Sequence, residues 1–99
     1  MLAKHVINCL AEMANEAEDQ IYRRLEKPFS LKTKFLIRDG NWNLLIVLLG
    51  KGKIIYAQLD FKELSNYVVC ESEIIELKKR ARILANLILL RLKDGDSKL

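Results

Sequence analysis

The chain has 99 residues, of which 51% are hydrophobic and 30% are charged, and this balance is typical of one folded domain rather than of a disordered chain. Seventeen lysine and arginine residues against 13 acidic residues give a net charge of +4, which is lower than expected of a DNA-packaging protein. Two cysteines and one histidine are too few for a disulfide framework or for a histidine-rich metal site.

Residues 3–26 are predicted to form one long amphipathic helix. At 100° per residue its apolar side chains share one stripe, and most of its charged side chains lie outside that stripe. Pro28 ends the helix, because it disfavours helical geometry at the residue before it. A helix of this length spans about 36 Å, whereas a seven-residue strand spans about 23 Å. We therefore expect the helix to extend beyond the sheet that it covers.

Three strands are predicted, over residues 32–38, 42–49 and 53–59. The middle segment, WNLLIVLL, is apolar except at Asn43, which indicates a central strand with both faces covered. The dipeptides Asp39-Gly40 and Lys51-Gly52 suit two-residue turns, in which glycine accepts a positive φ at little cost. These turns fix an antiparallel register. The register pairs Ile37 with Trp42, Phe35 with Leu44, and Leu48 with Ile55.

This register gives the sheet two different faces. The predicted core face carries Thr33, Phe35, Ile37, Trp42, Leu44, Ile46, Leu48, Ile55, Ala57 and Leu59. The opposite face has an apolar centre and a polar rim, which is typical of a surface that binds a partner. Its apolar centre consists of Leu36, Leu45, Val47, Leu49, Ile54 and Tyr56. Two interpretations stay open: a partner covers this face, or the C-terminal helix of the same chain does.

The segment between the last strand and the C-terminal helix carries weaker signals. Asp60 and Glu63 have the spacing of a capping box, which predicts a short helical turn over residues 61–64. Residues 67–70 are a candidate for a fourth, short edge strand.

A second long helix is predicted over residues 73–93, with Ser72 as its N-cap and Gly95 as its end, followed by a polar tail over residues 94–99. Its second half, ILANLILLRL, is apolar almost all the way round, which indicates burial on more than one side. The fold class is therefore α+β, with a three- or four-stranded antiparallel sheet and a long helix at each end.

A second copy of the chain could cover the surplus apolar surface, so the leading hypothesis is a stable homodimeric protein-interaction protein. The residues expected at the dimer interface are Leu45, Val47, Leu49, Tyr56, Leu87 and Leu90. The alternative hypothesis is nucleic-acid binding through a basic patch near the start of the C-terminal helix. The cations expected there are Lys78, Lys79, Arg80 and Arg82, helped by Lys32, Lys34 and Lys53. A plainer interpretation of the same cluster is a solvated helix face paired with Glu76.

The order helix, three strands, helix, together with the run KKRARILA, resembles the double-stranded-RNA-binding domain. Five positions match the KKxAKxxA start of that family's last helix: Lys78, Lys79, Ala81, Arg82 and Ala85. The chain departs from the family at Asn86, which replaces an alanine, and in the length of the first helix. It also lacks the family's Gly-Pro-x-His loop and has an extra segment before the last helix. The resemblance implies that the chain binds duplex RNA.

No catalytic, metal or cofactor site is predicted, and no small-molecule substrate is implied. His5 is the only imidazole, and it lies on the polar flank of the first helix, where a solvated side chain is expected. Cys9 and Cys70 are expected to be small buried hydrophobes, with an intrachain disulfide as the alternative. No nucleophile can be paired with a base, so we do not expect an enzyme.

The composition is rich in Leu, Ile, Lys and Glu, with one threonine and one proline, a style that fits a heat-stable protein. In this overall character the chain resembles the small proteins of unknown function from filamentous viruses of hyperthermophilic archaea, the lipothrixviruses and rudiviruses. The resemblance implies a virus-encoded protein in the host cytoplasm. An intracellular location also fits the N-terminus, which does not look like a signal peptide, and the lack of an apolar run near the ~20 residues that span a bilayer.

Overall fold

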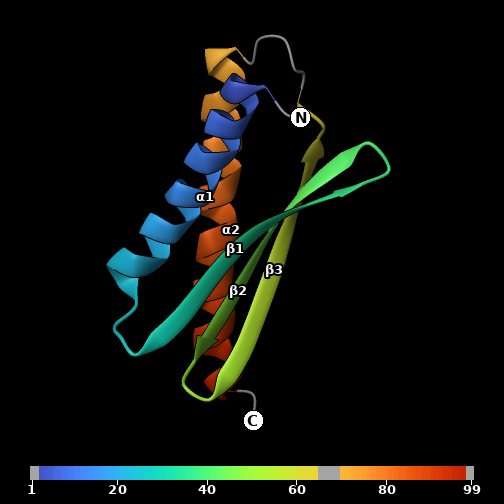
Figure 1. The fold of residues 1–99 in the computed structure, drawn as a ribbon. Helices are drawn as coiled ribbons and strands as arrows, with labels where there is room; N and C mark the ends of the chain where they lie inside the picture. Colours follow the sequence, from blue (N-terminus) through green and yellow to red (C-terminus); the bar gives the residue numbers. More distant parts are fainter. Residues whose placement is uncertain (1–2, 65–69, 98–99) are drawn as a thin grey trace.

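The protein folds into two helices and one three-stranded sheet in a computed structural model that describes residues 3–64 and 70–97. The elements follow in the order α1 (Lys4–Arg24), β1 (Phe29–Arg38), β2 (Asn41–Gly50), β3 (Lys53–Lys62) and α2 (Glu71–Ser97). The sheet is antiparallel in the order β1-β2-β3 (Figure 1). The predicted α+β class is confirmed, and β2 is the central strand as expected.

Both hairpins have the register that the turn dipeptides predict. The observed partners include Ile37 with Trp42, Phe35 with Leu44, and Leu48 with Ile55. At the first turn φ is 50° at Asp39 and 77° at Gly40, and at the second it is 55° at Lys51 and 72° at Gly52. Two consecutive positive φ angles are the signature of a turn whose twist matches that of the flanking strands.

Both helices pack on the same face of the sheet, where they lie side by side and run in the same direction (Figure 1). The buried side chains of β2 all lie on this inner face, because successive residues of a strand point to opposite faces. They are Trp42, Leu44, Ile46 and Leu48. Each helix packs one buried stripe of side chains into the same core. The molecule therefore has two layers, one of helices and one of strands, and neither helix covers the other face of the sheet.

Helix α1 buries one stripe, as its 3.6-residue period predicts. The stripe consists of Val6, Cys9, Leu10, Met13, Ala17, Gln20 and Ile21. Each strand has ten residues rather than the predicted seven or eight, so the difference in length on which the expected overhang of this helix depends is absent. Ten residues of strand span about 33 Å, close to the length of about 32 Å for this 21-residue helix.

Helix α2 is longer than predicted and is buried on one side only. It runs from Glu71 to Ser97, so Ser72 lies inside it rather than at its cap and Gly95 does not end it. Its buried residues form one stripe made of Leu77, Ala81, Leu84, Ala85, Ile88 and Leu92. The elements in the described part of the chain therefore do not supply the burial on several sides that the apolar second half predicts.

The segment after residue 59 differs from the prediction. Strand β3 continues through Lys62, so the helical turn expected over residues 61–64 is wrong. The physical reason is Phe61, which is 4% exposed and packs edge-to-face against Trp42 and Phe35 with ring centroids 6.1 Å apart. This burial outweighs the local capping signal. Of the predicted strand over residues 67–70, residues 67–69 lie outside the described part of the chain, and Cys70 is not in a strand.

Candidate protein-interaction surface

The outer face of the sheet carries exposed apolar side chains, because both helices cover the inner face. On β3 the side chains of Ile54 and Tyr56 are 71% and 65% exposed, and on β2 that of Leu49 is 41% exposed. On the same face Val47 lies opposite Tyr56 and Leu45 lies opposite Gln58, and both β2 side chains are half-buried. The C-terminal helix does not lie over this face, so that interpretation of the apolar centre is wrong.

Helix α2 adds a second exposed apolar strip. Ile83, Leu87 and Leu90 follow one another at intervals of four and three residues, which places them on one side of a helix. Their side chains are 66%, 38% and 56% exposed. This strip lies on the side of α2 away from the core, since the buried stripe of the helix occupies the opposite half of its circumference.

A groove joins the two apolar areas across strand β3. The groove has a volume of about 460 Å³, and its lining includes Leu45, Val47 and Tyr56 from the sheet and Leu87 and Arg91 from α2. Four of the six residues predicted for a dimer interface therefore lie together although they come from three elements. We call the combined area the outer apolar surface; it consists of Leu45, Val47, Leu49, Ile54, Tyr56, Ile83, Leu87 and Leu90.

A second groove lies on the other flank of the exposed strip. Its volume is about 760 Å³, and it separates the end of α1 and the β2–β3 turn from the C-terminal half of α2. Half of the residues in its lining are leucines, including Leu89 and Leu90, and Arg24, Lys51 and Lys93 also line it. Leu87 lines the first groove and Leu90 the second, so this part of the strip on α2 is a ridge between two grooves.

Two arginines that the sequence analysis did not assign to this surface fix α2 against the edge of β3. Arg91 Nη1 donates a hydrogen bond to the backbone carbonyl oxygen of Tyr56 at 2.9 Å, and Arg80 Nη2 donates one to that of Asp60 at 2.7 Å. The two contacts hold α2 along the β3 edge, where Leu87 lines the same groove as Leu45, Val47 and Tyr56. No sequence motif marks this role, because an arginine on the flank of an amphipathic helix is also the commonest solvated arrangement.

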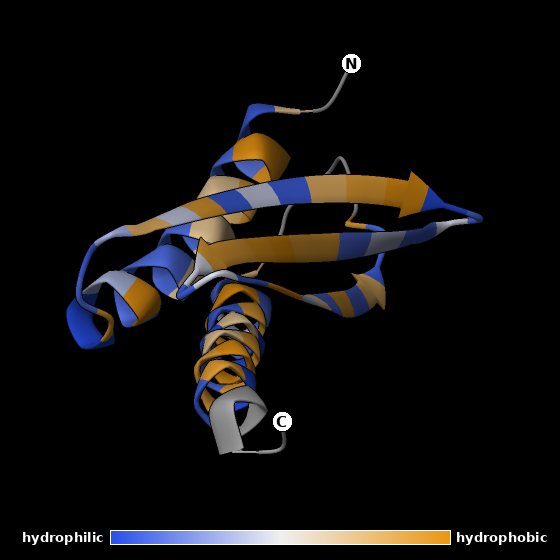
Figure 2. Cartoon of the chain, turned by 90° about the horizontal axis from the view of Figure 1, so that it is seen from below, coloured by the Kyte–Doolittle hydropathy of each residue, from blue (hydrophilic) through white to orange (hydrophobic). Residues whose placement is uncertain are grey.

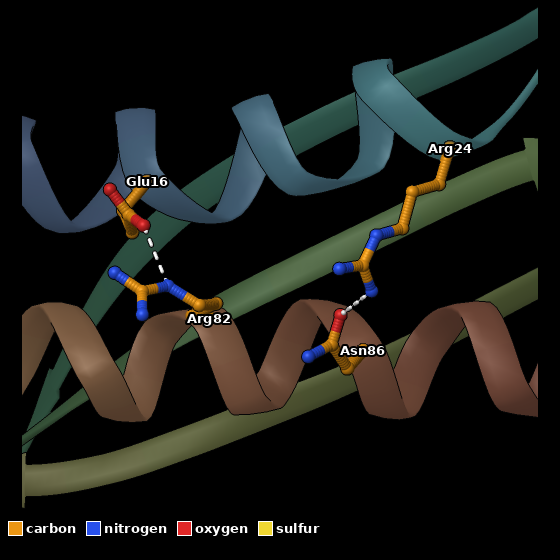
Figure 3. A network of polar contacts seen from close by, with 4 residues as sticks. All are labelled: Glu16, Arg24, Arg82 and Asn86. Atoms are coloured by element: carbon orange, nitrogen blue, oxygen red, sulfur yellow. Dashed lines mark hydrogen bonds and ion pairs between the residues drawn. The ribbon is translucent and has the colours of Figure 1, made fainter.

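The structure does not bring the predicted basic patch together. Arg82 Nε pairs with Glu16 Oε1 at 2.8 Å on the α1 side of the helix (Figure 3), whereas Arg80 reaches β3 on the other side. Lys79 is exposed and Lys78 is half-buried, and the four side chains diverge because successive residues are 100° apart on a helix. The cluster also lies inside α2, which begins at Glu71.

The three helper cations predicted for nucleic-acid binding lie elsewhere in the sheet. Lys32 and Lys34 are exposed on the outer face of β1, and Lys53 is the first residue of β3. Strand β1 is the edge farthest from α2 in the order of the sheet. The seven predicted cations are therefore distributed over three separate areas.

Both cysteines are free, and their environments differ. Cys9 is buried as expected, and burial raises the pKa of its thiol, with a further rise from the carboxylates of Glu12 and Glu73. Cys70 is exposed, so its predicted burial is wrong. The prediction that His5 is solvated is also wrong in part, because His5 Nε2 is buried and has no hydrogen-bond partner within the described part of the chain.

Within residues 3–64 and 70–97, no group of three or more histidine, cysteine, aspartate or glutamate residues is arranged to hold a metal ion. In the same part of the chain, neither helix combines the length and the hydrophobicity needed to cross a membrane.

Comparison of the chain with protein-family models, with curated proteins and with solved structures finds no match. The observed element order agrees with the order of the double-stranded-RNA-binding domain. Two implications stay predictions: that the chain binds duplex RNA like that family, and that it is a protein of a filamentous archaeal virus.

Proposed function

We propose that this protein is a homodimeric protein-interaction protein without catalytic activity, and that two copies meet through the outer apolar surface. The observation that supports the proposal is the continuity of this surface across three elements. Eight apolar side chains from β2, β3 and α2 are partly or largely exposed on it, and a groove whose lining includes four of them (Leu45, Val47, Tyr56 and Leu87) joins the three elements. Exposed apolar areas rimmed by polar residues are typical of protein-binding sites.

The monomer exposes more surface than a compact chain of the same mass. Its accessible area is 6870 Å², whereas a compact monomer of 11.5 kDa is expected to expose about 5,800 Å². The radius of gyration is 14.4 Å, against about 13 Å for a compact chain of this length. The excess of about 1,000 Å² agrees with the elongated shape, whose principal extents are 47 × 27 × 19 Å, and an elongated molecule has room for a standard interface of ~800 Å² per partner.

The shape of the surface favours a second copy of this chain as the partner. The ridge of Leu87 and Leu90 lies between two grooves, so a ridge related by a twofold axis can occupy a groove of the other copy while offering its own groove in return. The distribution of apolar residues along α2 and β2 is visible in Figure 2. Arg91 is the charged residue in the lining of the groove, and its guanidinium already donates a hydrogen bond to the backbone carbonyl oxygen of Tyr56.

The test is the mass of the protein in solution by sedimentation equilibrium between about 1 and 100 μM. We expect a dimer for the natural sequence and a monomer for Leu87→Glu, because an unpaired carboxylate buried at an interface costs several kcal/mol. The matched control is Ile37→Glu, which places the same charge on a 62% exposed isoleucine outside the outer apolar surface. Circular dichroism shows whether each variant is folded.

Tyr56→Glu is the second variant, in case Leu87→Glu does not fold. A monomeric natural protein at 100 μM contradicts the proposal. So does a dimer that Leu87→Glu and Tyr56→Glu both leave intact, because the interface then lies elsewhere on the molecule.

Nucleic-acid binding through the seven predicted cations is the second candidate, and the exposure of Lys32 and Lys34 is the observation in its favour. The divergence of the cations on α2 makes it the weaker candidate, since Arg80 and Arg82 already have partners within the chain. Fluorescence anisotropy with duplex DNA and duplex RNA tests it. Binding that weakens steeply between about 50 and 200 mM salt supports it, and no binding at 50 mM salt rejects it.

A further inference from the structure

The two edges of the sheet differ in their protection. At the β3 edge, the side chains of Arg80 and Arg91 donate hydrogen bonds to the backbone carbonyl oxygens of Asp60 and Tyr56. At the β1 edge, none of the backbone or side-chain hydrogen bonds observed within residues 3–64 and 70–97 reaches an outward backbone group. An unprotected edge strand is a template on which another strand can pair.

The first hairpin shows which backbone groups of β1 are free. Arg38 and Asn41 flank a two-residue turn and face each other, so they form a hydrogen-bonded pair. Pairing alternates along an antiparallel strand. The even-numbered residues of β1 therefore bond to β2, and the odd-numbered residues direct their N–H and C=O groups away from the sheet. The odd-numbered residues in the middle of the strand are Leu31, Thr33 and Phe35.

A second copy of β1 fits this edge poorly. In an antiparallel pair centred on Thr33, Lys32 of one copy lies opposite Lys34 of the other on the outer face. The twofold symmetry of the pair repeats this contact, so two lysine–lysine contacts form. Moving the centre to Lys32 or to Lys34 places a lysine opposite itself. Like charges directly opposite each other destabilise a strand pair, and lysine on an edge strand is a known protection against self-pairing.

We propose that the β1 edge binds an extended segment of a partner protein in which acidic and apolar residues alternate. The acidic side chains lie on the outer face beside Lys32 and Lys34, both of which are exposed. The apolar side chains lie on the inner face beside Leu31 and Phe35, which are half-buried and pack at the margin of the core. The backbone of the added strand pairs with the free N–H and C=O groups, as in other proteins that bind peptides by strand addition.

The first test uses synthetic peptides and the natural protein. The probe is a fluorescein-labelled seven-residue peptide in which valine and glutamate alternate, and binding is measured by fluorescence anisotropy at 50 mM salt. We expect this peptide to bind at least tenfold more tightly than the peptide in which lysine replaces glutamate. Methylation of the backbone nitrogens on the edge-facing side of the peptide removes its donors, and we expect it to abolish binding.

The second test changes the edge. Thr33→Pro removes the central outward N–H, and proline is tolerated where the N–H of an edge strand faces solvent. We expect at least a tenfold loss of affinity for the acidic peptide. Thr33→Ala is the matched control: it removes the hydroxyl that donates to Glu18 Oε2 at 2.6 Å but keeps the N–H, so affinity is expected to change less than threefold. Ile37→Pro, at a largely exposed side chain, replaces Thr33→Pro if that variant does not fold.

Charge reversal separates this site from the proposed dimer interface. Lys32→Glu with Lys34→Glu is expected to reverse the peptide preference, whereas Leu87→Glu is expected to leave it unchanged. Equal binding of the acidic and basic peptides, or binding that survives backbone methylation, overturns the proposal. So does a loss of binding in Leu87→Glu but not in Thr33→Pro, which moves the peptide to the outer apolar surface. If the natural protein is an oligomer and the Thr33→Pro variant is a monomer, a second copy of the chain occupies the β1 edge, and the proposed partner is wrong.

Discussion

Arg91 of α2 donates a hydrogen bond from Nη1 to the backbone carbonyl oxygen of Tyr56 on β3, at 2.9 Å. Arg80, three helical turns earlier, makes the equivalent contact with Asp60 at 2.7 Å. The helix therefore runs antiparallel to the strand and along its edge (Figure 1). Contacts at both ends fix the position of the exposed strip on α2 relative to the outer face of the sheet, and they occupy carbonyl groups that another strand would otherwise use.

The double variant Arg80→Ala with Arg91→Ala is expected to lose about 2 kcal/mol of unfolding free energy, since a typical hydrogen bond contributes about 1 kcal/mol. It is also expected to aggregate faster on heating, because the freed β3 edge can pair with another chain. Urea unfolding and thioflavin fluorescence measure the two effects. The control is Lys79→Ala with Lys93→Ala, which removes the same charge from exposed positions of the same helix. Equal aggregation of the two double variants contradicts the role assigned to the arginines.

The centre of the sheet could be predicted from the sequence because local signals agree there. Glycine at the second position of each turn permits a positive φ, and the period-two pattern then admits only one register. The ends of the strands depend on contacts between residues distant in sequence. Strand β1 begins at Phe29, whose ring packs against Tyr22 with centroids 5.3 Å apart, and β3 continues to Lys62 because Phe61 packs against Trp42.

The candidate surface could be predicted only residue by residue. Alternation along β2 places Leu45 and Val47 on the outer face, and helical spacing groups Leu87 with Leu90. Neither pattern shows on which side of the sheet α2 lies or that it follows the β3 edge. That position results from the packing of the Ile88 stripe into the core and from the bonds of Arg80 and Arg91 to the strand backbone, and no local signal encodes it.

Cys9 is expected to make stability depend on pH above neutrality. Burial, with the carboxylates of Glu12 and Glu73, raises the pKa of its thiol in the folded state. The folded protein therefore holds a proton that the unfolded chain releases above about pH 8.5. This contribution is fully present below that pH and is lost as the pH rises toward the folded pKa. We expect the unfolding free energy to fall more steeply between about pH 8 and 10 in the natural protein than in Cys9→Ala.

The same burial predicts that the two cysteines differ in reactivity toward a thiol reagent. The exposed Cys70 is expected to react within seconds at pH 8, and Cys9 only after urea unfolds the protein, because the reactive thiolate needs both ionisation and access. Two thiols that react equally fast in the folded protein contradict the buried position of Cys9.

Trp42 is expected to tolerate replacement by phenylalanine better than its burial suggests. Its side chain is 1% exposed, and its Nε1 has no hydrogen-bond acceptor within the described residues. A buried donor without a partner costs about 1–3 kcal/mol, and Trp42→Phe removes that cost together with part of the ring. We expect the free energy of unfolding to fall by less than about 1.5 kcal/mol in Trp42→Phe, against about 2–5 kcal/mol in Leu44→Ala, which changes a neighbouring core residue. Urea unfolding followed by circular dichroism measures both, and a loss above 3 kcal/mol for Trp42→Phe contradicts the unpaired donor.

The pair formed by Arg82 and Glu16, with Nε and Oε1 2.8 Å apart, is expected to contribute little to the packing of α1 against α2. The two side chains are 47% and 20% exposed, so solvent screens their attraction, and a double-mutant cycle with alanine should give a coupling of about 0.5 kcal/mol. Arg24 and Asn86 form a matched contact on the same helix pair, in which Nη1 donates to the neutral Oδ1 at 2.8 Å (Figure 3). Raising the salt concentration to 1 M should remove most of the first coupling and little of the second, because only the first joins two charges. Equal salt sensitivity of the two cycles contradicts this assignment.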